Sequence, residues 1–185
     1  MTRRSLRPTS RIEIIAWVAL VVFLGWRIWP QIGAAAGIAS DNAPLQPFEL
    51  RTLQDTVVSD TTLRGQVALI NYWATWCGPC RVEMPGFQRI YERYRGQGFT
   101  VLGIATDAGG PEVVRPFLTE RGITYPVAMA PGGPVGGFSA ATVLPTSYLV
   151  DRNGRIRYEV KGIFAPVALE QAVRRLLAEP APTAR

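Results

Sequence analysis

Apolar residues gather first in one long run near the N-terminus. Residues 14–26, IIAWVALVVFLGW, carry no charge, and the wider stretch 12–29 has its two charged residues, Glu13 and Arg27, close to its ends. A membrane-spanning helix needs about 20 apolar residues, and charged side chains near its ends can reach the headgroups. We therefore predict a transmembrane anchor in this stretch. A cleaved signal peptide, with the small residues GAAAGIAS at its cleavage region, remains an alternative.

Arginines precede this run and bear on its orientation. Arg3, Arg4, Arg7 and Arg11 lie upstream of it, and positive residues tend to stay on the cytoplasmic side of a membrane. A buried helix of a soluble protein, the third alternative, would leave this cluster unexplained. An anchor and a signal peptide would both export the residues that follow. We therefore expect an exported domain that an uncleaved anchor would tether to the membrane.

The hydrophobic pattern divides the chain into four parts. Residues 1–29 are the expected cytoplasmic N-terminus and anchor or signal peptide. Residues 30–46 are rich in Pro, Gly and Ala, show no sustained periodicity, and are typical of a flexible linker. Residues 47–179 carry the pattern of a folded domain, and residues 180–185 are an expected frayed tail.

From residue 47 the pattern is that of a mixed α/β domain. Two nearly continuous apolar runs, 67–74 and 99–106, indicate strands buried on both faces. Helical spacing follows each of them, over 77–95 and over 111–122. The remaining predicted elements are a hairpin over 48–59 with Asp55 near its turn, a second hairpin around Arg152-Asn153-Gly154, and a closing helix over 166–179.

Composition narrows the kinds of function. The chain has 185 residues and a net charge of +6, but much of this charge belongs to the N-terminal arginines, and no basic stripe marks the folded domain. We therefore expect no nucleic acid partner. Histidine is absent, which removes the commonest general base and metal ligand. Two cysteines alone cannot complete a four-ligand zinc site, so we expect neither a metal site nor a cofactor.

Cys77 and Cys80, the only cysteines, lie where strand 67–74 leads into helix 77–95. A residue at a helix N-terminus faces unpaired N–H groups and the positive end of the helix dipole. Both stabilise a thiolate, so we expect the pKa of Cys77 to lie below that of a free cysteine.

Cys80 returns to the same side of the first turn and can form a disulfide with Cys77. A Cys77–Cys80 disulfide would close a very short loop, so it would restrict the unfolded chain little and add little stability. We therefore predict redox exchange rather than a structural staple, with Cys77 attacking a partner disulfide and Cys80 resolving the mixed disulfide.

The sequence around the cysteines, WATWCGPC, resembles the signature of the thioredoxin superfamily. The segment VLPTSYLVDRNGRI resembles the one in which that superfamily carries a cis-proline facing the cysteines, and Pro145, between Leu144 and Thr146, matches this proline. Within the superfamily the chain is most similar to the TlpA/ResA-like branch of membrane-tethered oxidoreductases. The shared features are the N-terminal anchor, the lead-in FELRTLQDTVVSDTTLRGQVALINYWATWC, and the 65-residue separation of Cys80 from Pro145. The resemblance covers about residues 47–178.

The resemblance implies an α/β thioredoxin fold with an N-terminal hairpin and a central strand–helix insertion, preceded by a transmembrane helix. It also implies a thiol–disulfide oxidoreductase that acts on protein dithiols and disulfides. Gly78 and Pro79 resemble the residues between the cysteines of thioredoxin, whose potential is about −270 mV. We therefore expect mainly a disulfide reductase, recharged by a membrane thiol electron donor, with cytochrome c or copper-site cysteines as substrates.

Two other functions remain open at this point. One is a net disulfide oxidase or isomerase on the same fold. The other is a copper-binding assembly factor that uses the two cysteines as ligands, although relatives of that kind usually supply a histidine and this chain has none.

The chain departs from ordinary thioredoxins close to the cysteines. Asn71 occupies the position of a buried aspartate that serves proton transfer in those proteins, whereas Glu83 matches an acidic residue that ResA-like proteins carry near the active site. We expect Glu83 to take over proton transfer; the alternative is that it only favours the start of the helix electrostatically. We place Trp73 in the core. The residues expected to contact substrate are Trp76, Gly78, Pro79, Leu144, Pro145 and Thr146.

Overall fold

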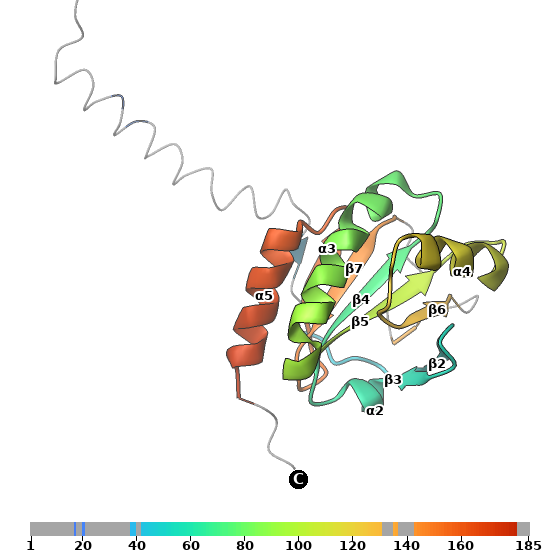
Figure 1. The fold of residues 1–185 in the computed structure, drawn as a ribbon. Coiled ribbons are helices and arrows are strands. Elements are labelled where there is room, and N and C mark those ends of the chain that lie inside the picture. The colour runs from blue at the N-terminus through green and yellow to red at the C-terminus, as the bar shows by residue number, and fades with distance from the viewer. Residues whose placement is uncertain are drawn as a thin grey trace, which may run out of the picture. The chain divides into compact units, whose positions relative to one another are not determined.

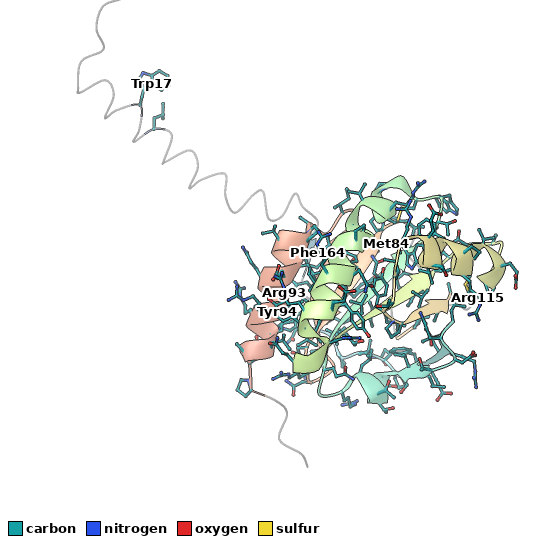
Figure 2. The ribbon with its side chains drawn as sticks, viewed as in Figure 1. Trp17, Met84, Arg93, Tyr94, Arg115 and Phe164 are labelled. Atoms are coloured by element: carbon teal, nitrogen blue, oxygen red, sulfur yellow. A yellow bond between two sulfur atoms is a disulfide. The ribbon has the colours of Figure 1, made fainter. Side chains whose placement is uncertain are left out.

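The computed structural model describes residues 42–130, 135–136 and 143–180, together with Ile38–Ala39, Trp17 and Leu20. Trp17, which is labelled in Figure 2, and Leu20 are helical and exposed. The rest of the predicted anchor, part of the predicted linker and residues 181–185 of the predicted tail lie outside the described residues. In the part of the chain that the structure describes, no helix is both long enough and apolar enough to cross a membrane.

Among the described residues, six strands form one mixed sheet in the order β1-β8-β7-β4-β5-β6. Figure 1 labels four of these strands, β7, β4, β5 and β6, which lie side by side in that order. β4 pairs in parallel with β5 and antiparallel with β7, so it lies in the middle of the sheet. All seven of its residues are buried, as its continuous apolar run predicts. The strands are β1 (Ile38–Ala39), β4 (Val67–Trp73), β5 (Phe99–Ala105), β6 (Val127–Met129), β7 (Thr146–Val150) and β8 (Ile156–Lys161).

The longer helices share one hydrophobic cluster with one face of the sheet. These helices are α3 (Gly78–Tyr94), α4 (Pro111–Glu120) and α5 (Pro166–Ala178), and the short 3-10 helix η1 (Arg95–Gln97) follows α3. The cluster contains Leu69 and Trp73 of β4 and side chains from all three long helices. Trp73 is fully buried, which confirms its predicted place in the core.

The N-terminal part of the domain covers the other face of the sheet. β2 (Glu49–Arg51) and β3 (Val57–Ser59) form an antiparallel hairpin, followed by α2 (Asp60–Leu63). Leu50 and Leu63 from this part join Ile70 and Tyr72 of β4 in a second hydrophobic cluster. Asp55, in the hairpin turn, has a φ of 59°, a left-handed conformation that Asp tolerates better than most residues. The predicted hairpin, with Asp55 in its turn, is therefore confirmed.

The structure corrects the predicted linker. Ile38–Ala39 form β1, which pairs antiparallel with β8. Leu45 is buried, its N–H donates to the Gly154 carbonyl at 2.8 Å, and the carbonyl of Ala43 accepts from the Ile156 N–H at 2.9 Å. The chain therefore joins the folded domain by residue 38 rather than at residue 47. Two-residue strands and backbone hydrogen bonds demand no side-chain periodicity, so the sequence pattern contained no sign of this pairing.

Candidate active site

Cys77 lies at the N-cap of α3, directly after the strand that runs through the middle of the sheet. A turn connects β4 to the helix, and it is closed by a hydrogen bond from the Cys77 N–H to the Ala74 carbonyl at 3.1 Å. Cys77 has extended backbone angles, and its sulfur accepts a hydrogen bond from the Cys80 N–H at 3.3 Å. At an N-cap the preferred acceptor of the equivalent bond is a side-chain oxygen of Ser, Thr, Asp or Asn. The predicted start of the helix at Cys77 is confirmed.

Cys77 and Cys80 form a disulfide with a Cα–Cα distance of 5.3 Å. Cys77 is 5% exposed and Cys80 is fully buried, so Cys77 is the more accessible of the two residues. The neighbouring residues Trp76, Gly78 and Pro79 are exposed around it, and Trp76 is 71% exposed. Within the described residues, no group of three or more His, Cys, Asp or Glu side chains lies close enough together to hold a metal ion.

A second segment, at the start of the neighbouring strand β7, lies at the same edge of the sheet as the turn to Cys77. The Leu144–Pro145 peptide bond is cis, which confirms the conformation predicted for Pro145. Thr146 pairs with Tyr72 near the end of β4, so the segment before Thr146 lies at the same edge of the sheet as the turn to Cys77. The Thr146 hydroxyl donates to the Val143 carbonyl at 2.7 Å, and the Pro145 carbonyl accepts from the Gly162 N–H at 2.8 Å. These bonds tie the proline segment together and to the loop after β8.

Glu83 is fully buried one helical turn after Cys80. One carboxylate oxygen accepts from the Asn71 side-chain amide at 3.1 Å, and the other accepts from the backbone N–H of Phe164 at 3.0 Å. Burial raises the pKa of Glu83 to about 7, although the two hydrogen bonds oppose the shift by stabilising the carboxylate. Phe164 lies in the loop before α5 and is labelled in Figure 2. Groups from β4 and from the loop before α5 therefore both bind the Glu83 carboxylate of α3.

The structure adds Ser147 and Tyr125, which the sequence did not single out, to the surroundings of Asn71 and Glu83. The Asn71 amide nitrogen donates to Glu83 and also to the hydroxyl of Ser147 at 3.0 Å. Asn71 and Ser147 are direct neighbours in the β4–β7 register. Tyr125 is fully buried, and its pKa is raised first by burial and then by the negative charge of Glu83. A polar residue inside an apolar strand was the available signal for Ser147. The Phe164 N–H gave none.

Comparison with known proteins assigns the chain to a family. The model of the AhpC/TSA family matches residues 40–159. The chain belongs to the AhpC/TSA family. Within it, the chain is 30% identical over 130 residues to the thiol-disulfide oxidoreductase ResA of Bacillus thuringiensis subsp. konkukian (strain 97-27), which covers 70% of this chain and 74% of the relative. It is 34% identical over 134 residues to ResA of Oceanobacillus iheyensis, covering 70% of this chain and 68% of the relative. This AhpC/TSA protein is a ResA-like thiol–disulfide oxidoreductase.

Solved structures confirm the predicted thioredoxin-like α/β fold of this AhpC/TSA domain. A thiol:disulfide interchange protein of the thioredoxin family from Chlorobium tepidum TLS superposes with a TM-score of 0.65 at 28% identity, covering 76% of this chain and 99% of that one. A secreted thiol-disulfide isomerase from Corynebacterium glutamicum gives a TM-score of 0.67 at 26% identity, covering 73% of this chain and 86% of that one.

Proposed function

We propose that this oxidoreductase is an exported, membrane-tethered disulfide reductase that works through Cys77 and Cys80. The observation that carries the proposal is the disulfide at the N-terminus of α3, at the same edge of the sheet as the cis-proline segment. A thiolate at a helix N-terminus is stabilised by the N–H groups and the dipole. Cys77 is the accessible member of the pair, so it is the sulfur that meets a substrate.

The reaction moves two electrons from the dithiol to a substrate disulfide. The Cys77 thiolate attacks one sulfur of the substrate, a Cys77–substrate disulfide forms, and the other substrate sulfur leaves as a thiolate. Cys80 then loses its proton and attacks the Cys77 sulfur. The Cys77–Cys80 disulfide forms again and the second substrate thiolate leaves. A membrane thiol electron donor restores the dithiol by the same exchange in reverse.

Glu83 is the proposed acceptor of the Cys80 proton. Both residues lie on α3, three positions apart, which places them on the same side of the helix. A group whose pKa is close to the working pH is the most effective general base, and burial raises the pKa of Glu83 to about 7. The bonds from Asn71 and Phe164 hold the carboxylate in place. Asn71 cannot titrate, so in this proposal it orients the carboxylate that replaces the aspartate of ordinary thioredoxins.

The substrate is proposed to lie between the exposed rim and the proline segment. Trp76, Gly78 and Pro79 surround Cys77 and are open to solvent. Thr146 and Pro145 are buried, so their contribution is the shape of the adjoining wall, while Leu144 is partly exposed. The wholly or partly exposed apolar side chains of Trp76, Pro79 and Leu144 suit contacts with a segment of a cysteine-containing protein.

Export and direction of electron flow complete the proposal. The upstream arginines and the apolar run 14–26 support export, and one structural relative is described as a secreted enzyme. The Gly-Pro pair between the cysteines is shared with thioredoxin and supports a reducing role. Family resemblance suggests the haem-attachment cysteines of apocytochrome c or the cysteines of copper sites as substrates. A net isomerase is the second candidate, because that same relative is described as an isomerase.

Two measurements test this proposal. The reduction potential, from equilibration with glutathione redox buffers, is expected near the thioredoxin value of about −270 mV; a value near about −120 mV would instead assign an oxidising role. A Cys80→Ala variant should accumulate mixed disulfides through Cys77, and mass spectrometry of these adducts names the substrates. A Cys77→Ala variant is the matched control and should trap none. Equal trapping by both variants would overturn the assigned roles.

A further inference from the structure

Asp107 is a buried carboxylate that directly contacts the turn before Cys77. It follows β5, is 7% exposed, and both of its oxygens lie 3.1 Å from the backbone N–H of Thr75. The Thr75 hydroxyl donates to the same carboxylate at 2.5 Å. Charge-assisted hydrogen bonds to a carboxylate are among the stronger hydrogen bonds in proteins. Asp107 and Thr75 are 32 residues apart in sequence, so this contact joins two separate strand ends.

Thr75 is the first central residue of the turn that presents Cys77. The turn closes between the Ala74 carbonyl and the Cys77 N–H, so its two central residues are Thr75 and the exposed Trp76. The backbone around Asp107 is also held in place by two hydrogen bonds. The Thr106 N–H donates to the Trp73 carbonyl at 2.9 Å, and the Gly110 N–H donates to the Asp107 carbonyl at 3.1 Å. The path of the chain from β4 to the N-cap is therefore held from the end of β5.

We propose that Asp107 is a positioning residue for Cys77, acting through the backbone and hydroxyl of Thr75. Its carboxylate holds the turn so that the Cys77 sulfur stays at the N-cap, where the Cys80 N–H donates to it. The stabilisation of an anion by a helix terminus fades within the first turn. A turn released from Asp107 would therefore leave the Cys77 thiolate less stabilised. This inference rests on the proposed role of Cys77 as the attacking thiol.

Charge and position act on Cys77 in opposite directions, which makes the inference testable. Removing a nearby carboxylate charge would by itself lower the pKa of a thiol, whereas losing the N-cap position would raise it. Charged residues also lie near the start of α3 and of α4 and at the end of β8: Arg81, Glu83, Glu112 and Lys161. All of them stay unchanged in the variants below.

The test compares Asp107→Asn and Thr75→Val with the wild type as full-length reduced proteins. Asp107→Asn keeps the size and removes the charge and one acceptor; Thr75→Val keeps the charge and removes the hydroxyl bond. The rate of iodoacetamide alkylation is measured from pH 5 to pH 9, with mass spectrometry to identify the modified cysteine. We expect both variants to shift the half-titration pH of Cys77 upward by about 0.5–1 unit. Alkylation at pH 6 then slows by about 3–10-fold, while the rates at pH 9 converge.

Two controls separate positioning from a loss of stability. Thr75→Ser keeps the hydroxyl and should match the wild type. Asp151→Asn alters another buried aspartate, 4% exposed, which accepts from the N–H groups of Asn153 and Arg155 at 2.9 and 3.0 Å. Because Val150 pairs with Ala68, Asp151 lies at the opposite end of β4 from Cys77. It should lower stability without moving the titration.

Three results would overturn either the positioning role of Asp107 or the proposed function. A lower half-titration pH in Asp107→Asn would mean that its charge and not its hold on the turn acts on Cys77. If Thr75→Val folds and the half-titration pH of Cys77 is unchanged in it, Asp107 is only a structural residue. The Thr75→Val result also decides the question if Asp107→Asn does not fold. If the wild-type protein were alkylated first at Cys80, the proposed function would be overturned, because Cys77 would not be the attacking thiol. The contact between Asp107 and Thr75 would then have no bearing on the reactivity of the attacking cysteine.

Discussion

Two ionisable groups near the start of α3, only six residues apart, lie in opposite environments. Cys77 lies at the helix N-terminus, beside N–H groups that favour an anion. Glu83 lies inside the protein, where burial disfavours the carboxylate and raises its pKa to about 7. A site that needs an easily ionised attacking thiol and a proton acceptor poised near neutral pH requires such a difference. Environment, rather than residue type alone, separates the two roles.

At the residue scale, Glu83→Gln should slow the second half of the exchange. The amide cannot accept the Cys80 proton, and general acid–base assistance is typically worth about 10²–10⁴-fold. The wild-type rate of mixed-disulfide resolution should rise with pH through an ionisation near 7, following the pKa of Glu83, and this step should be absent in the variant. Stopped-flow measurement of resolution from pH 5 to pH 9 checks both points.

Glu92→Gln is the matched control, because Glu92 is an exposed glutamate on the same helix. It should leave the resolution rate and its pH profile unchanged. If Glu83→Gln also left them unchanged, Glu83 would not handle the proton, and its proposed role would fall.

At the scale of elements, α3 and α5 approach each other unusually closely at Gly86. A Cβ atom at Gly86 would lie 2.4 Å from Cγ and 2.8 Å from Cβ of Pro166, the first residue of α5. The loop before Pro166 carries the Phe164 N–H that binds Glu83. The contact between the two helices therefore also sets the distance between this loop and the carboxylate.

Gly86→Ala should destabilise the domain despite the better helix propensity of alanine. Alanine gains up to about 1 kcal/mol over glycine in a helix, but overpacking against a ring typically costs about 1–3 kcal/mol. Because the added Cβ meets a rigid proline, we expect a net loss of about 1 kcal/mol or more in the free energy of unfolding, measured with urea. Gly96→Ala is the control: its Cβ would meet nothing within 4 Å, so it should be neutral or stabilising. Equal effects of the two substitutions would contradict the close packing.

At the scale of the whole molecule, the burial of Glu83 links stability to pH. The pKa of Glu83 is raised from 4.5 to about 7 in the folded protein. Between these values the unfolded chain has released the proton that the folded protein still holds. The free energy of unfolding therefore falls as pH rises through this window and is constant above it. A shift of this size corresponds to roughly 3 kcal/mol.

The expected result is a loss of about 2–3 kcal/mol from the wild type between pH 5 and pH 8 that is missing in Glu83→Gln. Urea unfolding of the two oxidised proteins at both pH values gives the comparison, and Glu92→Gln should follow the wild type. The same pH dependence in Glu83→Gln would show that other groups cause it.

The position of the domain relative to a membrane also belongs to this scale. A reporter that is active only outside the cytoplasm, fused after Arg185, should be active, because the upstream arginines are expected to hold the N-terminus inside. Exchanging Arg3, Arg4, Arg7 and Arg11 for glutamine should lower that activity. Activity of a cytoplasmic reporter at the same site would overturn the proposed export. A carbonate wash that leaves the full-length protein in the membrane would favour the anchor over a cleaved signal peptide.

Local patterns in the chain were sufficient for most elements and for the redox pair. The apolar runs predicted β4 and β5, the change to helical spacing placed Cys77 at the start of α3, and the motif around Pro145 marked the cis-proline. Such features depend on neighbouring residues, whose spacing sets the local conformation and the face that is buried. Resemblance to known proteins then connected the two separate motifs.

Contacts between distant segments were settled only by the tertiary structure. Asn71 meets Ser147 across 76 residues, Phe164 meets Glu83 across 81, and Thr75 meets Asp107 across 32. The pairing of β1 with β8 likewise belongs to this class. A backbone N–H or a single polar side chain leaves no periodic trace in the sequence, because its partner is chosen by how the strands and helices pack. The sequence therefore located the dithiol, whereas packing decided which groups hold it, which carboxylate lies buried beside it, and how readily that carboxylate takes up a proton.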